Sequence, residues 1–305
     1  MKIAFYNAYH NGDIHVSRQF VKYVIEHVPA ESYTYFHRNS ERLLLDIPEL
    51  TARPFGECQG FDGNSRSQNV DGTIVLNTWY VVSPVFPQNS CNLNSLYHLF
   101  KDHFAQHFTY QLTEPSQYFI PTIDFHYYST DSCRRYLDSC VDYRLKVLVC
   151  NDDPKSGQSN VSGAKLTEAV RAVAAKHSDV LFLFTKKQAL QESRQPLFNV
   201  CYTPDIIGLP AYVTNLNENA YVSTRCDVVI GLASGAYTFS YIQDNLLNPD
   251  KTMVCFTTEE RIGRWVDKIK ANIISSPCFE AKEVEALIDN VIAEKLRSKV
   301  SRVLL

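Results

Sequence analysis

Residues 226–247, CDVVIGLASGAYTFSYIQDNLL, decide the fold class that this sequence predicts. Asp227–Gly231 contains three consecutive β-branched residues and ends at glycine, which predicts a short buried strand. Residues 232–236 are mostly small, and helical spacing follows them. A strand, a turn of small residues and a helix start form the repeating unit of an open α/β sheet. In such sheets the helix start presents main-chain N–H groups to anions, near the carboxyl end of the strand.

This turn has two interpretations. Ser234, Gly235 and Ala236 offer N–H groups and a helix dipole, as a phosphate-binding turn does. Alternatively, Ser234 merely caps the helix and Gly235 merely relieves crowding. The stretch by itself leaves both interpretations open.

Strands alternate with helices on both sides of this stretch. The first half is expected to hold strands at 1–6, 33–36, 73–80 and 123–128, helices at 14–28, 94–108 and 130–143, and a surface loop at 54–72. The second half is expected to hold strands at 145–150, 180–184, 199–202, 227–231 and 253–256, and helices at 163–177, 218–224 and 282–303. The alternation predicts an α/β protein with two parallel, Rossmann-like sheets. Its 305 residues fit two domains of about 150 each, which we place at 1–143 and 144–305.

The composition excludes several classes of protein. A net charge of −3 argues against nucleic acid as a partner. Nine cysteines, without a Cys-x-x-Cys pair, indicate reduced thiols in a cytoplasmic protein. The start, MKIAFYNAYHNGD, turns polar too early for a signal peptide. No stretch approaches the roughly 18 apolar residues of a membrane-spanning helix, so we expect a soluble chain without a transmembrane segment.

A carboxylate follows the first predicted strand. Asp13, in Gly12-Asp13, lies just ahead of the first helix, where it suits a general base toward a hydroxyl group. His10 and His15 flank it and are further candidates for the base or for binding an acceptor. The alternative is that Asp13 is an ordinary helix cap, which is a common use of Asp.

A polar loop follows the strand at 145–150. Lys155, Ser156 and Gln158 form a donor-rich run that suits phosphate oxygens or simple solvation. Asp152 and Asp153 fit Mg²⁺ or Mn²⁺ held against a diphosphate. However, Asp-Asp-Pro is equally a common way to end a strand and turn, and we favour the turn.

Three further side chains are candidates for binding a donor. Lys186 follows the strand at 180–184 and suits a phosphate, although such lysines are usually only solvated. Asn217 and Glu218 precede the helix before the strand at 227–231. Glu218 either accepts from a ribose hydroxyl or favours the helix N-terminus.

Other motifs argue against common chemistries. His103 and His107 have the i,i+4 spacing of a metal pair, but Phe104 stands where a metalloprotease has Glu, so we predict no metal site. The chain has neither G-x-G-x-x-G after the first strand nor a P-loop, which disfavours nicotinamide cofactors and P-loop chemistry. It also has no G-x-S-x-G elbow.

Two fragments together carry a family resemblance. The strand, loop and Gly12-Asp13 at the N-terminus, with Asn217-Glu218 and the strand leading to Ser234-Gly235, resemble the GT-B glycosyltransferases, and within them the heptosyltransferase-type branch. That family has two Rossmann-like domains facing across a cleft, an acceptor-side N-terminal domain and a C-terminal domain that binds the nucleotide-sugar. Asp13 matches the family's proposed base, and Ser234-Gly235 matches the Thr-Gly of its diphosphate turn. Ala233 stands where the family has Asp.

The resemblance implies an enzyme of glycan biosynthesis. Asp13 would deprotonate an acceptor hydroxyl, on a glycan or glycoconjugate, which attacks the anomeric carbon of a nucleotide-sugar with inversion and without a metal. Main-chain N–H groups at Ser234–Ala236, helped by Lys155 or Lys186, would stabilise the departing diphosphate. The nucleotide-sugar is a co-substrate, and no separate cofactor is implied.

Two other functions stay open at this point. One is a GT-B-like protein that binds a nucleotide or glycan without catalysis. The other is a metal-dependent transferase of sugar or pyruvyl groups that uses Asp152 and Asp153.

Overall fold

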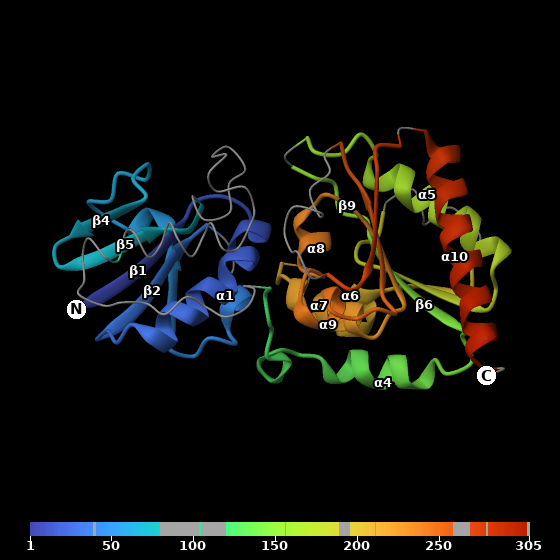
Figure 1. Cartoon of the computed structure of the whole chain (residues 1–305), viewed down its shortest axis with the longest axis horizontal. Helices are drawn as coiled ribbons and strands as arrows, with labels where there is room; N and C mark the ends of the chain where they lie inside the picture. Colours follow the sequence, from blue (N-terminus) through green and yellow to red (C-terminus); the bar gives the residue numbers. More distant parts are fainter. Residues whose placement is uncertain are drawn as a thin grey trace. The chain divides into compact units, whose positions relative to one another are not determined.

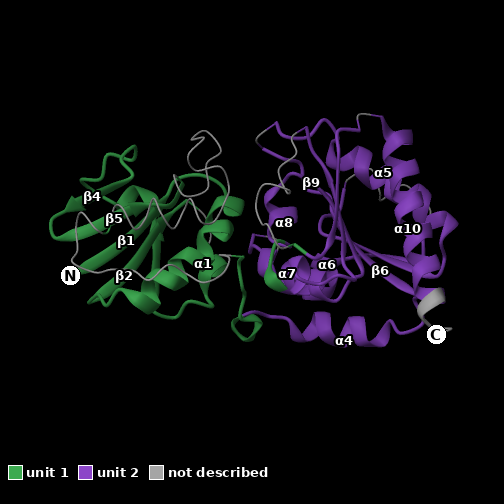
Figure 2. Cartoon of the chain, in the orientation of Figure 1, with its two compact units in different colours: residues 1–127, 241–243, 261–269 green, residues 128–240, 244–260, 270–305 purple. Residues whose placement is uncertain are grey.

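The chain folds into two compact units. The computed structural model describes residues 1–38, 41–79, 104, 120–155, 157–188, 196–210, 212–258, 269–278 and 280–303. Of these, unit 1 comprises the described residues of Met1–Tyr127, with Tyr241–Gln243 and Ile269. Unit 2 comprises the remainder, from Tyr128 onward (Figure 2).

Unit 1 is built on a five-stranded sheet with the strand order β3-β2-β1-β5-β4 (Figure 1). Its elements, in chain order, are β1 (Lys2–Asn7), α1 (Asn11–His27), β2 (Ser32–His37), the 3-10 helix η1 (Glu41–Leu44), β3 (Leu50–Pro54), the 3-10 helix η2 (Phe55–Glu57), β4 (Ser67–Val70), β5 (Thr73–Asn77) and the 3-10 helix η4 (Phe125–Tyr127). Strand β4 pairs antiparallel with β5, and the other pairs are parallel. After β1, the chain adds β2 and β3 on one side of this strand, and it adds β5 on the opposite side. The strand order therefore reverses between β1 and β5, which is where ligands bind in open α/β sheets.

Helix α1 covers one face of this sheet. Ser17 of α1 lies with its Oγ 3.0 Å from the hydroxyl of Tyr35 on β2. The Tyr33 hydroxyl donates to the carbonyl of Val28, the residue that ends α1, at 2.5 Å. Because side chains alternate along a strand, Tyr33 and Tyr35 mark the covered face, and Ser32, Thr34 and Phe36 lie on the opposite face.

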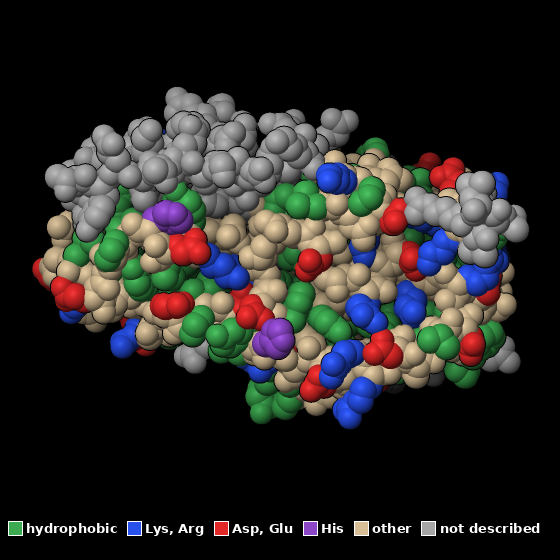
Figure 3. All heavy atoms as spheres, turned by 60° about the horizontal axis from the view of Figure 1, so that its bottom comes forward, with side chains coloured by type: hydrophobic (Ala, Val, Ile, Leu, Met, Phe, Trp, Pro, Cys, Tyr) green, Lys and Arg blue, Asp and Glu red, His purple; other side chains and the backbone are tan. Residues whose placement is uncertain are grey.

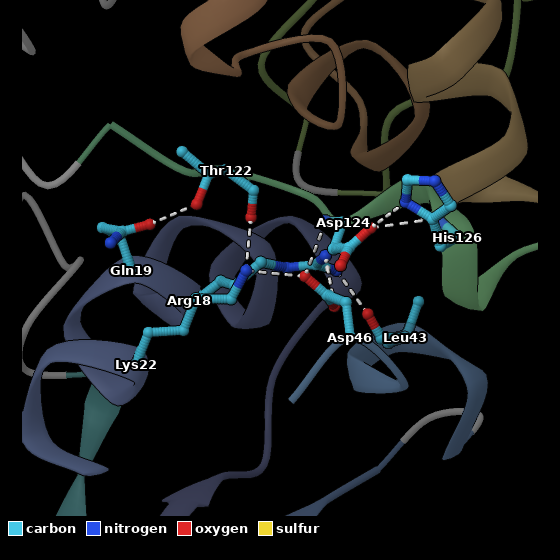
Figure 4. A network of polar contacts seen from close by, with 8 residues as sticks. All are labelled: Arg18, Gln19, Lys22, Leu43, Asp46, Thr122, Asp124 and His126. Atoms are coloured by element: carbon cyan, nitrogen blue, oxygen red, sulfur yellow. Dashed lines mark hydrogen bonds and ion pairs between the residues drawn. The ribbon is translucent and has the colours of Figure 1, made fainter. Parts of the chain in front are cut away.

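A buried ion pair anchors α1 within unit 1 (Figure 4). The Arg18 Nη1 atom lies 2.8 Å from Asp46 Oδ1, and both side chains are 0% exposed. Lys22 Nζ lies 2.7 Å from the second oxygen of Asp46 and donates to the Thr122 carbonyl at 2.9 Å. The main-chain N–H of Asp124 also donates to Asp46, at 3.3 Å. One carboxylate thus joins α1 to the segment that leads out of unit 1.

Unit 2 is built on a six-stranded parallel sheet with the order β11-β10-β9-β6-β7-β8. Its elements are α4 (Asp131–Ser139), β6 (Leu145–Cys150), α5 (Gly163–Lys176), β7 (Val180–Phe184), β8 (Val200–Tyr202), α6 (Thr203–Ile207), α7 (Leu216–Thr224), β9 (Val228–Leu232), α8 (Gly235–Thr238), α9 (Gln243–Leu246, which begins in unit 1), β10 (Thr252–Phe256), β11 (Asn272–Ser276) and α10 (Ala281–Val303). Apart from Lys146 of β6, its central strands are apolar throughout, because both faces of the sheet are covered. Helices α5 and α10 contribute Leu166, Val170, Val284 and Ile288 to the buried cluster.

Most predicted elements of the α/β pattern are present, with shifts at their ends. The prediction was wrong at 123–128, where a 3-10 helix stands in place of a strand. It also missed β3, β11, the short helices α6 and α9, and the 3-10 helices η1 and η2. It also assigned 54–72 to a loop, although β4 lies there and pairs with β5 across Asp71 and Gly72, whose φ angles are 48° and 80°. Asp-Gly between paired strands is a hairpin signal that the sequence displays. The predicted helix at 94–108, with His98, His103 and His107, lies outside the described residues apart from Phe104.

The division between the units differs from the expected one at 143/144. Helix α4 was expected to close the first domain, but it belongs to unit 2. The Tyr136 hydroxyl lies 2.7 Å from the Cys201 sulfur of β8, and Asp138 pairs with Arg225 at 2.5 Å. These contacts fix α4 to unit 2, so the boundary falls between Tyr127 and Tyr128.

The surface carries charges of both signs. On the face drawn in Figure 3, Lys and Arg side chains lie among Asp and Glu side chains, in keeping with the net charge of −3. Among the helices of the described ranges, none combines the length and the apolar character needed to cross a membrane.

Candidate functional site

The strand order of unit 2 places a ligand site beside β6 and β9. After β6 the chain adds β7 and β8 on one side, then crosses to add β9, β10 and β11 on the other. The order therefore reverses between β6 and β9, and a crevice opens outside the carboxyl ends of two such strands. The loops that leave β6 and β9 both start at this edge. They are the segments that the sequence singled out at 151–158 and 234–236.

The turn after β9 has the geometry of a helix start. Ser234 is the N-cap of α8, with extended backbone angles, and its side chain accepts a hydrogen bond from the N–H of Tyr237. The capping interpretation of Ser234 is therefore confirmed. Gly235 and Ala236 occupy the first two helical positions, whose N–H groups have no acceptor within a helix. Capping and anion binding are compatible here, because they use different N–H groups.

The buried amide of Asn151 organises the end of β6. Its Nδ2 donates to Thr167 Oγ1 and to the carbonyl of Lys186, both at 2.9 Å. Its Oδ1 accepts from the main-chain N–H of Lys186 at 3.0 Å. Helix α5 begins so close to this strand end that a Cβ at Gly163 would lie 2.1 Å from the Asn151 carbonyl oxygen. The loop after β6 is thus held at both ends.

Asp152 and Asp153 have separate structural partners. Asp153 Oδ1 accepts from the N–H of Gly163 at 2.7 Å, which caps α5. Asp152 Oδ2 accepts from the Thr185 hydroxyl at 2.9 Å, and burial raises the pKa of this carboxyl group. This agrees with the turn interpretation that the sequence favoured. Within the described part of the chain, no group of three or more His, Cys, Asp or Glu side chains is arranged to hold a metal ion.

The lysines and Gln158 lie around the same edge. Lys155 and Lys186 are exposed, and Gln158 is half-buried. The Gln158 carbonyl accepts from the Thr258 N–H at 3.0 Å and from the Thr257 hydroxyl at 3.1 Å, which ties the loop after β6 to the end of β10. Ser156 lies outside the described residues.

Asn217 and Glu218 are part of the packing of unit 2. Each is 1% exposed, at the start of α7. Glu218 Oε1 accepts from the N–H of Ser129, just ahead of α4, at 3.4 Å. The burial of both side chains, with this contact of Glu218, favours a structural role for them over contact with a ribose.

Asp13 occupies the first turn of α1 in unit 1, beside the reversal between β1 and β5. Its Oδ2 accepts from the main-chain N–H of His10 at 3.1 Å, so the capping interpretation is present in the structure. Asp13 is half-buried and His10 is exposed. Both remain within reach of solvent, as a base and an acceptor-binding group require.

His15 does not fit the role of a base. Its side chain is 0% exposed, and its Nε2 lies 3.3 Å from the Tyr241 carbonyl within unit 1. Burial lowers the pKa of this imidazole well below its usual value. A neutral ring sealed inside the unit neither meets an acceptor nor exchanges a proton with it, so the expectation for His15 is corrected.

A buried polar network under Asp13 was not found from the sequence. The Tyr35 hydroxyl lies 3.0 Å from Ser17 Oγ and 2.7 Å from Thr78 Oγ1, and Asn7 Nδ2 donates to Thr78 at 3.2 Å. Burial raises the pKa of Tyr35 to about 12, with a smaller contribution from the negative charge of Asp13. The available signal was Asn7 and Thr78, polar residues at the ends of apolar strands β1 and β5.

Three solved structures share this architecture, although no family model and no curated protein sequence matches the chain. The structure of E. coli ADP-heptose LPS heptosyltransferase II is 12% identical, with a TM-score of 0.58 over 98% of this chain and 99% of that one. E. coli heptosyltransferase WaaC with ADP-2-deoxy-2-fluoro heptose is 11% identical, with a TM-score of 0.53 over 96% and 99%. A family 9 glycosyl transferase from Veillonella parvula is 11% identical, with a TM-score of 0.52 over 94% and 90%. The chain therefore has the GT-B fold of the heptosyltransferase structures, with two Rossmann-like α/β units.

Proposed function

We propose that this protein is a glycosyltransferase that moves a sugar from a nucleotide-sugar donor to a hydroxyl group of a glycan or glycoconjugate acceptor. The observation that carries the proposal is the reversal of strand order between β6 and β9. It brings the turn at Ser234–Ala236 and the loop after β6 to one edge of the unit 2 sheet. The shared fold supports it, since one of the similar structures is heptosyltransferase WaaC with ADP-2-deoxy-2-fluoro heptose.

Donor binding uses main-chain N–H groups. Those of Gly235 and Ala236 stand at the start of α8, where a diphosphate oxygen is a suitable acceptor. Exposed Lys155 and Lys186 supply positive charge near the same edge. Such preorganised donors stabilise the negative charge that grows on a departing diphosphate.

The proposed reaction needs one base. Asp13 takes the proton of the acceptor hydroxyl, whose oxygen forms a bond to the anomeric carbon. The bond from that carbon to the diphosphate oxygen breaks, and the nucleoside diphosphate leaves with its electron pair. Attack opposite the leaving group inverts the anomeric configuration. This step needs no metal ion, because the main-chain amides donate hydrogen bonds to the leaving diphosphate and the lysines offset its negative charge.

A thermal-shift screen tests the donor site. The wild-type chain is scanned with ADP, UDP, GDP and CMP and with their sugar conjugates. A ligand present at about 100 times its dissociation constant adds about 2.7 kcal/mol of stability. If none of these compounds raises the melting temperature, the proposal fails.

Gly235→Pro is a matched variant for this screen. Proline removes the N–H group, and its ring and fixed φ angle are tolerated at the first helical position. The extended backbone of Ser234 also suits a residue before proline. We expect an unchanged melting temperature without ligand and nucleotide binding that is weaker by about 1.5–3 kcal/mol, the value of a hydrogen bond to a charged group.

The metal-dependent alternative is tested by a sugar-transfer assay with the donor that the screen identifies, run with and without EDTA. A transferase that uses Asp152 and Asp153 would lose activity in EDTA, whereas the proposed scheme keeps it. Nucleotide binding without turnover of any nucleotide-sugar would instead select the non-catalytic alternative.

A further inference from the structure

A groove lies on the face of the unit 1 sheet opposite α1. It has a volume of about 610 Å³ and is lined by Lys2, Ser32, Thr34, Phe36, Thr51, Arg53, Gly56, Glu57 and Gln59. All of these residues belong to β1, β2, β3, η2 and the turn after η2. Its volume is in the range of ordinary small-molecule sites.

The strand register explains how the lining side chains come together. Lys2 of β1 pairs with Ser32 of β2. Two residues further along β2, Thr34 pairs with Thr51 of β3, and after two more Phe36 pairs with Arg53. Paired residues of parallel strands point to the same face, so these form three successive rows. From Ser32 to Phe36 the groove runs roughly 13 Å along the strand.

The polar character of this face is unusual for a parallel sheet. Parallel sheets normally carry apolar residues on both faces, as the β7 run VLFLF of unit 2 does. Strands β2 and β3 instead place hydroxyl groups and an arginine at alternate positions. Ser32, Thr51 and Arg53 are exposed, and Thr34 and Phe36 are half-buried. Packing of a core therefore does not account for these side chains.

The groove offers the chemistry that polyols need. Three hydroxyl groups and the Gln59 amide both donate and accept hydrogen bonds. Arg53 and Glu57, whose charged atoms are 3.6 Å apart, present planar donors and acceptors side by side. Phe36 supplies an apolar surface for the C–H face of a sugar ring, and Lys2 adds a donor at the far end. A ligand rich in vicinal hydroxyl groups matches this set better than an apolar or a purely anionic one.

We propose that this groove binds a short oligosaccharide, on the face of the sheet opposite α1, the helix that carries Asp13. The inference concerns binding and stands whether or not the chain transfers a sugar. In a glycosyltransferase such a groove would hold part of a glycan other than the reacting sugar.

A glycan microarray tests the proposal. The probe is a set of immobilised short oligosaccharides, neutral and acidic, exposed to the fluorescently labelled full chain. Thr34→Trp fills the middle of the groove, and we expect it to weaken binding of the recognised glycan by at least about tenfold, or 1.4 kcal/mol. Thr51→Trp, on the exposed edge strand β3, provides a second obstruction should Thr34→Trp fail to fold.

The control is Glu26→Trp. It adds the same bulky ring at an exposed position of α1, in the layer that covers the other face, and should leave glycan binding within about twofold. The proposal is overturned if the wild-type chain binds no oligosaccharide, or if both groove variants bind as the wild type does. Binding limited to sulfated glycans and abolished by high salt would identify an anion site and would also overturn it.

Discussion

Gly231 lies directly under the ring of Tyr237. A Cβ atom at Gly231 would lie 2.6 Å from Tyr237 Cδ2 and 2.9 Å from the Cβ of Cys150. Tyr237 is 1% exposed and belongs to α8, the short helix that follows the turn at Ser234. The missing side chain of a central strand residue thus makes room for the ring that holds this turn against β9.

We predict that Gly231→Ala displaces the turn. The added methyl group overpacks the contact with Tyr237 and should destabilise the protein by about 1–3 kcal/mol. Nucleotide binding, if located as proposed, should weaken as well. Urea unfolding and the thermal-shift screen measure the two effects.

Gly56→Ala is the control for this substitution. A Cβ at Gly56 meets nothing within 4 Å, so the change should stay within about 0.5 kcal/mol. Equal unfolding curves for Gly231→Ala and the wild type would show that the contact with Tyr237 adapts without cost.

Removal of the Asp46 carboxylate is predicted to destabilise unit 1 strongly. Arg18 and Asp46 are both 0% exposed, and their pairing compensates for the lost hydration of the two charges. Asp46→Ala leaves the guanidinium of Arg18 and the ammonium of Lys22 without this partner. We expect a loss of about 3–5 kcal/mol in the free energy of unfolding.

An exposed pair supplies the comparison. Arg134 and Asp131 are as close, at 2.8 Å, but their side chains are 57% and 80% exposed. Water already solvates these charges, so Asp131→Ala should change stability by less than about 1 kcal/mol. A similar loss from both substitutions would contradict the assignment of the stabilisation to burial.

Stability should fall in acid because of His37. This side chain, at the end of β2, is 1% exposed, and burial lowers its pKa to about 4. The unfolded chain, with a pKa near 6.5, binds a proton that the folded chain does not accept between those two values. The stability contributed by the neutral ring is therefore present above about pH 6.5 and is lost as the pH falls to about 4, by about 3 kcal/mol.

His37→Gln checks this assignment, because the amide has no proton to gain. Urea unfolding at about pH 7 and about pH 4.5 should give a smaller difference in the variant than in the wild type. His15, whose pKa is also lowered by burial, leaves part of the acid sensitivity in place. If the variant and the wild type lose the same stability between the two pH values, His37 is not the source of the acid sensitivity.

The sequence predicted the apolar strands well and the polar ones poorly. Strands β6 and β7 read LKVLVC and VLFLF, and hydrophobic burial on both faces makes them evident. Strand β3 reads LTARP, and its residues Thr51 and Arg53 line the groove instead of a buried core. Such a strand is stabilised by pairing with β2, a long-range contact that no local pattern displays.

In the candidate site, too, the features set by neighbouring residues were predicted, and those set by distant residues were not. Capping by Ser234 and Asp13 follows from local chemistry and was among the interpretations that the sequence offered. Buried His15 contacts the carbonyl of Tyr241, a residue 226 positions away. Neither spacing nor residue type reveals such a contact, so a histidine beside Asp13 looked available when it is enclosed.

Replacement of Asp13 separates its two roles. As a cap, Asp13 accepts one hydrogen bond from the His10 N–H at 3.1 Å, and the amide oxygen of asparagine accepts equally well. As a base it must take a proton, which asparagine does not do at neutral pH. Asp13→Asn should therefore keep the melting temperature and the nucleotide-induced shift of the wild type. Its transfer of sugar, measured with the donor that the screen identifies, should fall by about 10²–10⁴-fold.

Asp13→Ala should lose both the activity and part of the stability, because it removes the cap as well. Full transfer by Asp13→Asn would leave capping as the role of this carboxylate, and the base would then have to be sought among the other groups of unit 1, with exposed His10 the first to test.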